Sequence, residues 1–249
     1  MDINNEYGCL EIHNELLKLM KYFHEFCVKN EIKYSMIGGS LLGTVRDNGF
    51  IPWDDDIDIM VERKSLKTLI KLIEGSNVLK IKRTLWVYRV QMKDSVVIKN
   101  GYTPTLDLFM VDNMPDNIKE RQIHLFKLYA LQGMIKEKPD YSRFTLKNKV
   151  LLFSTYYLGK LFSQSFKMNL YDKIAQSKNE VSTQYKAIFY AQFHQLKFLY
   201  PKDMMERVSL HKFENIEVYI TDEYDSVLTM TYGDYMTPPK KKDRKPIHS

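Results

Sequence analysis

Apolar residues follow two different periods along the chain, which predicts both helices and strands. Over Glu11–Lys29 they recur every three or four residues, the spacing of an amphipathic helix. The short apolar runs Lys33–Ile37 and Thr105–Val111 predict strands instead. Beyond residue 117 the helical period continues through Ile118–Lys138 and Thr145–Phe166. The pattern therefore predicts an α+β fold, with additional helices in the C-terminal half.

The segment Gly38–Met60 interrupts this pattern with glycine, turn and acidic residues. It reads GGSLLGTVRDNGFIPWDDDIDIM. The Gly-Gly pair ends the first strand, a short helical stretch follows, and Asn48-Gly49 and Pro52 signal turns. Four aspartates then occur within five residues, interleaved with isoleucines: Asp54, Asp55, Asp56 and Asp58.

The alternation of side chains along a strand determines which face each aspartate of the acidic run occupies. It places Asp56 and Asp58 on one face and turns Asp55 to the other. At about 3.3 Å per residue the two carboxylates lie roughly 6–7 Å apart, so that one cation between them would accept an oxygen from each. Hard oxygen ligands favour Mg²⁺, Mn²⁺ or Ca²⁺ over zinc. An acidic, solvated surface turn is the alternative interpretation.

Three common metal- or phosphate-binding motifs do not fit the segment. An EF-hand loop counted from Asp54 needs Gly and Glu where Ile59 and Ser65 stand. A Walker A loop needs Lys where Thr44 stands, and a Rossmann fingerprint needs Gly where Ser40 stands. These classes of nucleotide and calcium site are therefore excluded.

The remaining pattern is a Gly-Gly-Ser turn, a short helix and an Asp-apolar-Asp strand, and it resembles the nucleotidyltransferase superfamily. The longer string GGSLLGTVRDNGFIPWDDDIDI is similar, more narrowly, to the LicD family, the phosphorylcholine-transferase-like proteins of surface-glycan pathways. The stretch Tyr232–Met236, followed by Pro238-Pro239 and a basic run, also resembles the end of LicD-type proteins. The resemblance implies a nucleotidyltransferase-like catalytic core in residues 1–116, with a small mixed β-sheet flanked by helices. It implies that residues 117–249 supply a helical region and a C-terminal tail that complete the same domain.

The resemblance also implies a third carboxylate on a strand beside the acidic one. Asp107, between Leu106 and Leu108, is similar to that position, although an edge-strand acid facing water is an alternative. The expected catalytic and metal-binding residues are thus Asp56, Asp58 and Asp107, with Mg²⁺ as the cofactor and Mn²⁺ as an alternative. The expected substrate- and phosphate-binding residues are Gly38, Gly39, Ser40, Arg46, Asp54, Lys241, Arg244 and His248. For Arg46, a surface salt bridge to Asp47 or Asp54 is the other interpretation.

The composition limits the partners of the chain. A net charge of +6 over 249 residues suits a nucleotide, a phosphorylated lipid carrier or an anionic membrane, but is too small to indicate nucleic acid. The two cysteines form no Cys-x-x-Cys pair, which argues against a zinc or disulfide framework. The polar start and the lack of an apolar run of about 18 residues predict a cytoplasmic protein. The basic, aromatic-rich stretch Lys147–Lys167 is expected either to form a core helix or to lie on the inner face of the membrane.

Three functions remain open. The resemblance implies a metal-dependent phosphotransferase that moves phosphocholine or a related phospho-polyol from a CDP-activated donor to a sugar hydroxyl of a cell-surface glycan or its lipid-linked precursor. The alternative is a nucleotidyltransferase that moves NMP from an NTP to a small molecule or alcohol phosphate. A binding protein with a relic site is the third, and the presence of all three carboxylates argues against it. Choline recognition needs an aromatic cage, for which 17 Tyr, 13 Phe and 2 Trp offer too many candidates.

Overall fold

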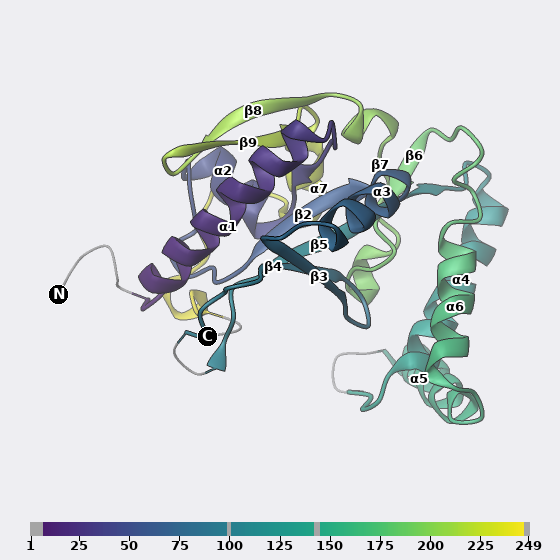
Figure 1. Cartoon of the computed structure of the whole chain (residues 1–249). Coiled ribbons are helices and arrows are strands. Elements are labelled where there is room, and N and C mark those ends of the chain that lie inside the picture. The colour runs from purple at the N-terminus through teal and green to yellow at the C-terminus, as the bar shows by residue number, and fades with distance from the viewer. Residues whose placement is uncertain (1–6, 99–100, 142–144, 247–249) are drawn as a thin grey trace. The chain divides into compact units, whose positions relative to one another are not determined.

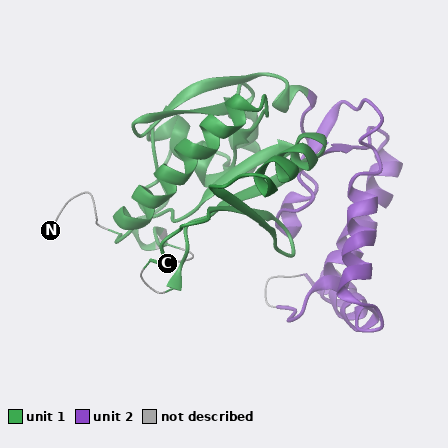
Figure 2. Cartoon of the chain, in the orientation of Figure 1, with its two compact units in different colours: residues 1–111, 203–249 green, residues 112–202 purple. Residues whose placement is uncertain are grey.

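The computed structural model describes residues 7–98, 101–141 and 145–246 (Figure 1). The chain divides into two compact units, which Figure 2 shows in different colours. Unit 1 contains residues 1–111 and 203–249, and unit 2 contains residues 112–202. The predicted α+β class is confirmed, whereas the predicted regions 1–116 and 117–249 of one domain stay a prediction.

Unit 1 is built on a mixed sheet with the strand order β1-β2-β5-β4-β3. β2 and β5 are parallel, and the other neighbours are antiparallel. The acidic run lies at the start of a central strand, because β2 begins at Ile57, directly after Asp56. The strands are β1 Ser35–Met36, β2 Ile57–Glu62, β3 Leu79–Arg83, β4 Tyr88–Met92 and β5 Leu106–Met114.

Helices and a hairpin from both ends of the chain complete unit 1. They are α1 Leu10–Lys29, α2 Gly38–Arg46, α3 Arg63–Glu74, α7 Tyr224–Tyr232 and the hairpin of β8 Val208–Phe213 with β9 Ile216–Thr221. The helix predicted over Glu11–Lys29 is confirmed as α1, and its apolar face, including Leu16 and Phe23, is fully buried. The hairpin is fixed to β1 because Thr221 N donates to the Oγ of Ser35 at 2.8 Å.

Unit 2 is mostly helical. Its elements are α4 Ile118–Ile135, α5 Leu146–Gly159, α6 Gln164–Ala175, β6 Tyr185–Ala187 and β7 Tyr200–Pro201. β6 pairs with the last three residues of β5, which extends from unit 1 into unit 2.

The single helix predicted over Thr145–Phe166 is wrong, because the chain turns between α5 and α6. Gly159 ends α5 where a Cβ atom would overlap the main chain of Met134 on α4. Ser163 then begins α6 as its N-cap, and its Oγ accepts a hydrogen bond from Phe166 N at 3.2 Å. The apolar period continues through this turn, so that periodicity alone did not reveal the break.

Candidate functional site

Two glycines place the start of α2 directly against two carboxyl groups. A Cβ atom added to Gly38 would lie 2.7 Å from Oδ2 of Asp58, and one added to Gly39 would overlap Oδ2 of Asp54. Gly38 also has a φ of +60°, which favours glycine. The Gly-Gly pair is therefore required for the close approach of these carboxyls. We call Asp54, Asp56, Asp58 and Asp107 the carboxylate centre.

Ser40 joins α2 to the strand that carries Asp58. Its Oγ accepts a hydrogen bond from Asp58 N at 2.8 Å, and the N–H of Ile37 donates to the Asp58 carbonyl at 3.1 Å. The main chain of Asp58 is thus held through both its N–H and its carbonyl, which fixes the direction of the carboxyl. This supporting contact is an observed role of Ser40, and its predicted contact with a phosphate is not tested by it.

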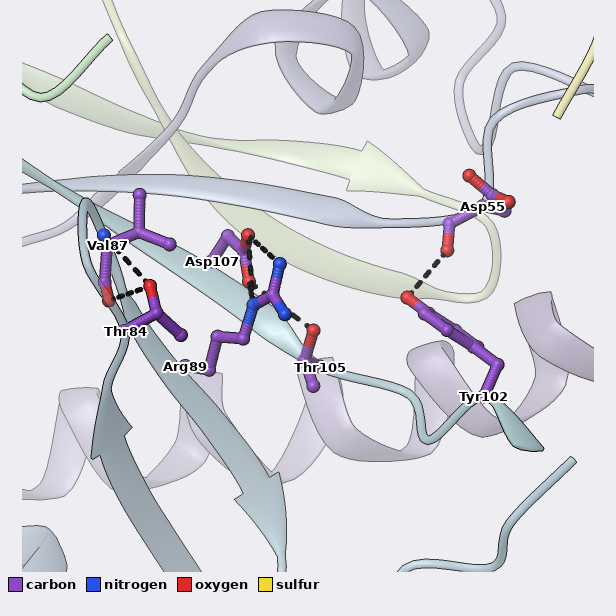
Figure 3. A network of polar contacts seen from close by, with 7 residues as sticks. All are labelled: Asp55, Thr84, Val87, Arg89, Tyr102, Thr105 and Asp107. Carbon is purple, nitrogen blue, oxygen red and sulfur yellow. Dashed lines mark hydrogen bonds and ion pairs between the residues drawn. The ribbon is translucent and has the colours of Figure 1, made fainter. Parts of the chain in front are cut away.

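Asp58, Asp107 and Arg89 form a row across three neighbouring strands. Asp58 is paired with Asp107 in the parallel β2–β5 ladder, and Arg89 is paired with Asp107 in the antiparallel β4–β5 ladder. Directly paired residues point to the same face of a sheet. Figure 3 shows the Arg89 guanidinium beside Asp107, and Arg89 Nε donates to Asp107 Oδ1 at 3.0 Å. Asp107 therefore lies next to Asp58 on the sheet, with an arginine partner that the sequence analysis missed.

Burial and like charge raise the pKa of these carboxyls. Burial, followed by the charges of Asp56, Asp54 and Asp107, raises the pKa of Asp58 well above its usual range. Burial, followed by the charges of Asp56 and Asp55, raises the pKa of Asp54 to about 8. A side-chain hydrogen bond with Asp56 makes a smaller contribution that also raises the pKa of Asp54. Negative charge packed in this way is neutralised by protons or by a cation.

The chemistry of this donor set fits a divalent cation. Carboxylate oxygens are the ligands that Mg²⁺ prefers, and a cation here would relieve the repulsion that raises the pKa of Asp54 and Asp58. Within the described ranges, no three His, Cys, Asp or Glu side chains are already arranged as metal ligands. The carboxylates thus fit a metal by their chemistry, and the ligand set of Asp56, Asp58 and Asp107 is still a prediction.

Two residues distant in sequence hold the acidic run. His13 Nε2 on α1 donates to the Asp54 carbonyl at 2.6 Å, and its ring stacks on Phe50 with centroids 4.2 Å apart. Burial lowers the pKa of His13, which favours the neutral imidazole. Tyr102 donates its hydroxyl proton to the carbonyl of Asp55 at 3.0 Å (Figure 3). Asp55 itself is fully buried, so its side chain belongs to the interior of unit 1.

Arg46 forms a salt bridge with Asp47, the contact that was the alternative interpretation, and its phosphate contact stays a prediction. Its Nε donates to Asp47 Oδ1 at 2.9 Å, and a terminal nitrogen donates to Oδ2 at 2.8 Å. Both carboxylate oxygens of Asp47 are therefore engaged by the guanidinium.

The C-terminal segment returns to the residue before the acidic run. The Arg244 guanidinium lies over the Trp53 ring, 5.1 Å from its centroid, and Arg244 Nε donates to the Pro239 carbonyl at 2.9 Å. Lys241 is exposed in the short 3₁₀-helix Lys241–Asp243. His248 lies outside the described residues. Of these three predicted phosphate contacts, the structure places Arg244 beside the acidic run.

The mixed sheet, the Gly-Gly-Ser start of α2 and the carboxylates on neighbouring strands define a nucleotidyltransferase-like domain. Residues 31–138 match the family described as "LicD/FKTN/FKRP, nucleotidyltransferase domain". This segment is therefore a LicD-type domain, and the resemblance inferred from the motif is confirmed. The carboxylate centre and Arg89 lie inside the match, whereas Lys241, Arg244 and His248 lie outside it.

Comparison with individual proteins extends the similarity beyond this domain. The chain is 27% identical over 256 residues to the lipopolysaccharide cholinephosphotransferase LicD of Haemophilus influenzae, covering 93% of this chain and 92% of that protein. Uncharacterised proteins of Rickettsia prowazekii and Rickettsia typhi are each 57% identical over 44 residues. Those 44 residues are 18% of this chain and 16% and 14% of the two rickettsial proteins, so they carry no information on the remainder.

Proposed function

We propose that this chain is a LicD-type phosphotransferase. It moves phosphocholine, or a related phospho-polyol, from a CDP-activated donor to a sugar hydroxyl of a cell-surface glycan or its lipid-linked precursor. The observation that carries the proposal is the alignment with a cholinephosphotransferase over 93% of the chain. The carboxylate centre within the matched domain supports it, because phosphoryl transfer depends on charge neutralisation.

In this reaction the acceptor hydroxyl oxygen forms a bond to the phosphorus that carries the alcohol. The anhydride bond to CMP breaks, and CMP leaves with its electron pair. In the proposal, Asp107 either completes the ligand set of a cation or acts as the base that receives the hydroxyl proton. The first N–H groups of α2, at Gly38, Gly39 and Ser40, are the proposed donors to a phosphate oxygen, since such groups have no acceptor inside their own helix.

The proposal includes a divalent cation, Mg²⁺ or alternatively Mn²⁺, held by Asp56, Asp58 and Asp107. When bound, this ion would neutralise the diphosphate of the donor. Asp107 must then loosen its ion pair with Arg89, whose side chain is 45% exposed and thus able to reorient. The released guanidinium is our candidate for pairing with a donor phosphate oxygen.

A second part of the proposal concerns access to a lipid-linked acceptor. Large apolar side chains on α5, in the turn after it and at the start of α6 are exposed to solvent by 41–79%. We call them the apolar stripe: Leu146, Val150, Phe153, Tyr157, Leu158, Leu161, Phe162 and Phe166. Residues 141–171 contain five basic residues and no Asp or Glu. The stripe thus combines apolar exposure with charge of one sign.

These properties favour a peripheral contact with an anionic membrane at its inner face. Aromatic and leucine side chains beside lysines are typical of a helix that lies in the lipid headgroup region. A core helix, the other interpretation of this segment, would bury these side chains. A second copy of the chain on the stripe would bring like charges together. Among the helices that the structure describes, none is long and apolar enough to cross a bilayer.

The nucleotidyltransferase reaction is the second candidate, because the matched domain carries that name. The same carboxylates would serve it, but the attack would occur on the α-phosphorus of an NTP and release pyrophosphate. The leaving group therefore distinguishes the two reactions.

The decisive experiment measures both leaving groups. The purified chain with Mg²⁺ is incubated with CDP-choline, CDP-ethanolamine, CDP-glycerol or CDP-ribitol and a lipid-linked glycan, and CMP is measured. Parallel reactions with the four NTPs are assayed for pyrophosphate. We expect acceptor-dependent CMP release with CDP-choline, while pyrophosphate without CMP would replace our proposal by the second reaction.

A further inference from the structure

A cleft of about 500 Å³ in unit 1 lies beside the acidic run and has no role in the chemistry proposed above. It is adjacent to the carboxylate centre, since Trp53 directly precedes Asp54 and His13 bonds to the Asp54 carbonyl. Its aromatic and charged lining consists of Tyr7, His13, Phe50, Trp53, Glu214 and Arg244. The cleft therefore offers aromatic faces and one carboxylate next to the proposed reaction site.

One ring of the cleft already carries a cation, and the other rings pack in pairs. Trp53 and Tyr7 meet edge to face with centroids 5.6 Å apart, and His13 stacks on Phe50. The guanidinium of Arg244 lies over the Trp53 ring at 5.1 Å, within the range of a cation–π interaction. The Trp53 face thus accepts a positively charged group in this structure.

Glu214 brings negative charge to the same cleft from a strained position. It lies at the tip of the β8–β9 hairpin with a φ of +54°, a conformation that non-glycine residues rarely adopt. Its N–H donates to the Asn48 carbonyl at 2.8 Å, and its Oε1 accepts from Phe50 N at 3.0 Å. These bonds hold the carboxylate at the cleft although the side chain is exposed.

We propose that this cleft binds the quaternary ammonium group of a choline-containing substrate. Trp53 supplies the aromatic face and Glu214 the opposite charge, and the ligand displaces Arg244 from the ring. The inference rests on the proposed function, because the aligned relative is a cholinephosphotransferase. Phospho-polyols carry no cation to place against an aromatic face, so the cleft favours choline over a polyol.

The test measures binding of the bare headgroup to the full chain, without turnover. Choline and tetramethylammonium are titrated by calorimetry, with glycerol as the uncharged probe. Trp53→Leu removes the aromatic face, and we expect it to weaken binding of both cations about tenfold. Glu214→Gln keeps the oxygen that accepts from Phe50 N and removes only the charge. The variant should therefore fold normally, and we expect its affinity for both cations to fall several-fold.

Three further substitutions sharpen the test. Arg244→Gln removes the tethered cation, and we expect choline to bind several-fold more tightly. Glu217→Gln changes an exposed glutamate on the same hairpin and should leave binding unchanged. In a Trp86→Phe background Trp53 is the remaining tryptophan, so that choline should change its fluorescence while glycerol does not.

The possible outcomes separate this inference from the proposed function. If CMP is released from CDP-choline while choline binding is unaffected by Trp53→Leu and Glu214→Gln, the cleft assignment is overturned and the function stands. If choline binds in a Trp53-dependent way but no CDP-alcohol yields CMP, the cleft assignment stands and the function fails. Equal binding of glycerol and choline would also overturn the assignment.

Discussion

The carboxylate centre and the apolar stripe depart from ordinary folding rules in opposite directions. In unit 1, acidic groups are packed together against two glycines, so that the pKa of Asp54 and Asp58 is raised. In unit 2, leucine and aromatic side chains of α5 are left in water. Packing like charges and exposing apolar area both cost free energy of folding.

This difference indicates which kind of binding partner would stabilise each region. Crowded carboxylates are stabilised by a cation, whereas an exposed apolar helix with lysines is stabilised by an anionic, apolar surface. Local rules are broken in proteins chiefly at functional sites. In both regions, removal of the unusual feature is therefore expected to lower function without lowering the stability of the fold.

The largest effect is expected for Asp58→Asn. The amide keeps the shape but removes one charge from the centre, so turnover should fall by at least about 100-fold, as even outer-shell changes at metal sites do. Thermal stability should be unchanged or higher, because repulsion with Asp56 and Asp54 is removed. Asp47→Asn, at the Arg46 pair, is the control. Near-normal CMP release by Asp58→Asn would show that this carboxylate does not take part.

The next largest effect is expected for Gly39→Ala. Its Cβ would overlap the Asp54 carboxyl, and overpacking of this kind costs about 1–3 kcal/mol of unfolding free energy. Urea unfolding measures this loss. The matched control is Gly75→Ala at the end of α3, where the nearest atom to a new Cβ lies at 3.6 Å. Equal stability of the two variants would mean that the carboxyl moves away freely.

A smaller effect, on binding alone, is expected in the apolar stripe. Phe153→Ser together with Leu161→Ser should weaken sedimentation with anionic liposomes about tenfold or more, since roughly 1.5–3 kcal/mol accompanies burial of each large apolar side chain. The melting temperature should not fall, because both side chains are already in water. Val28→Ser, exposed by 49% on α1, is the control. A stripe that folds against another part of the protein would instead show a lower melting temperature.

Raised salt should also weaken this binding, and so should charge reversal at Lys149 and Lys160. Lys167 is a useful contrast, because its Nζ is buried and donates to the Met134 and Gly159 carbonyls. Loss of binding at Lys149 and Lys160 without salt dependence would argue against an electrostatic contact.

The smallest effect concerns His124, a buried polar group in unit 2. Within the described structure its Nε2 has no hydrogen-bond partner. Burial, followed by the charges of Lys127 and Lys178, lowers the pKa of His124 from 6.5 to about 4. The unfolded chain then binds a proton more readily than the folded one between these values, so stability falls as pH drops from about 6.5 to about 4.

His124→Phe removes the contribution of His124 to the pH dependence of stability, since a phenyl ring beside Phe189 does not titrate. Its melting temperature should fall less than that of the wild type over the same pH interval, by a few degrees. The exposed His194→Phe serves as control. Identical pH profiles for both variants and the wild type would mean that His124 is solvated in unit 2.

The sequence was informative about this site where residues act through local spacing. Asp56 and Asp58 were found from strand alternation, and Asp107 on a strand beside them was what the resemblance implied. The close approach of Gly38 and Gly39 to Asp58 and Asp54 was not predicted, because it depends on how α2 packs against the acidic run. Arg89 could not be predicted from the sequence, because its pairing with Asp107 depends on the register of β4 on β5. His13 and Glu214 are 41 and 164 residues from the groups that they hold, a separation that no periodicity encodes.

The fold, too, could be predicted only where the local sequence pattern determines the element. α1 was predicted from its helical period, β5 from a short apolar run, and β2 from the alternation of aspartates with isoleucines. The hairpin strand β8 was missed: its residues alternate only weakly between buried and exposed positions. The break between α5 and α6 was missed because it depends on the contact of Gly159 with α4, which is a tertiary constraint.

The discontinuity of unit 1 has a consequence for synthesis. Its sheet and acidic run emerge with residues 1–111, but Thr221 N and Glu214, which hold β1 and the Asn48–Phe50 loop, belong to the second segment, 203–249. At roughly 5–20 residues per second, the ribosome needs about 5–20 s to make the intervening residues. During that time the helices of unit 2 are available to fold, while β1 and the Asn48–Phe50 loop lack the contacts that the hairpin later makes. A stop codon before residue 203 would yield a chain that retains the strands of the mixed sheet but lacks the hairpin and α7.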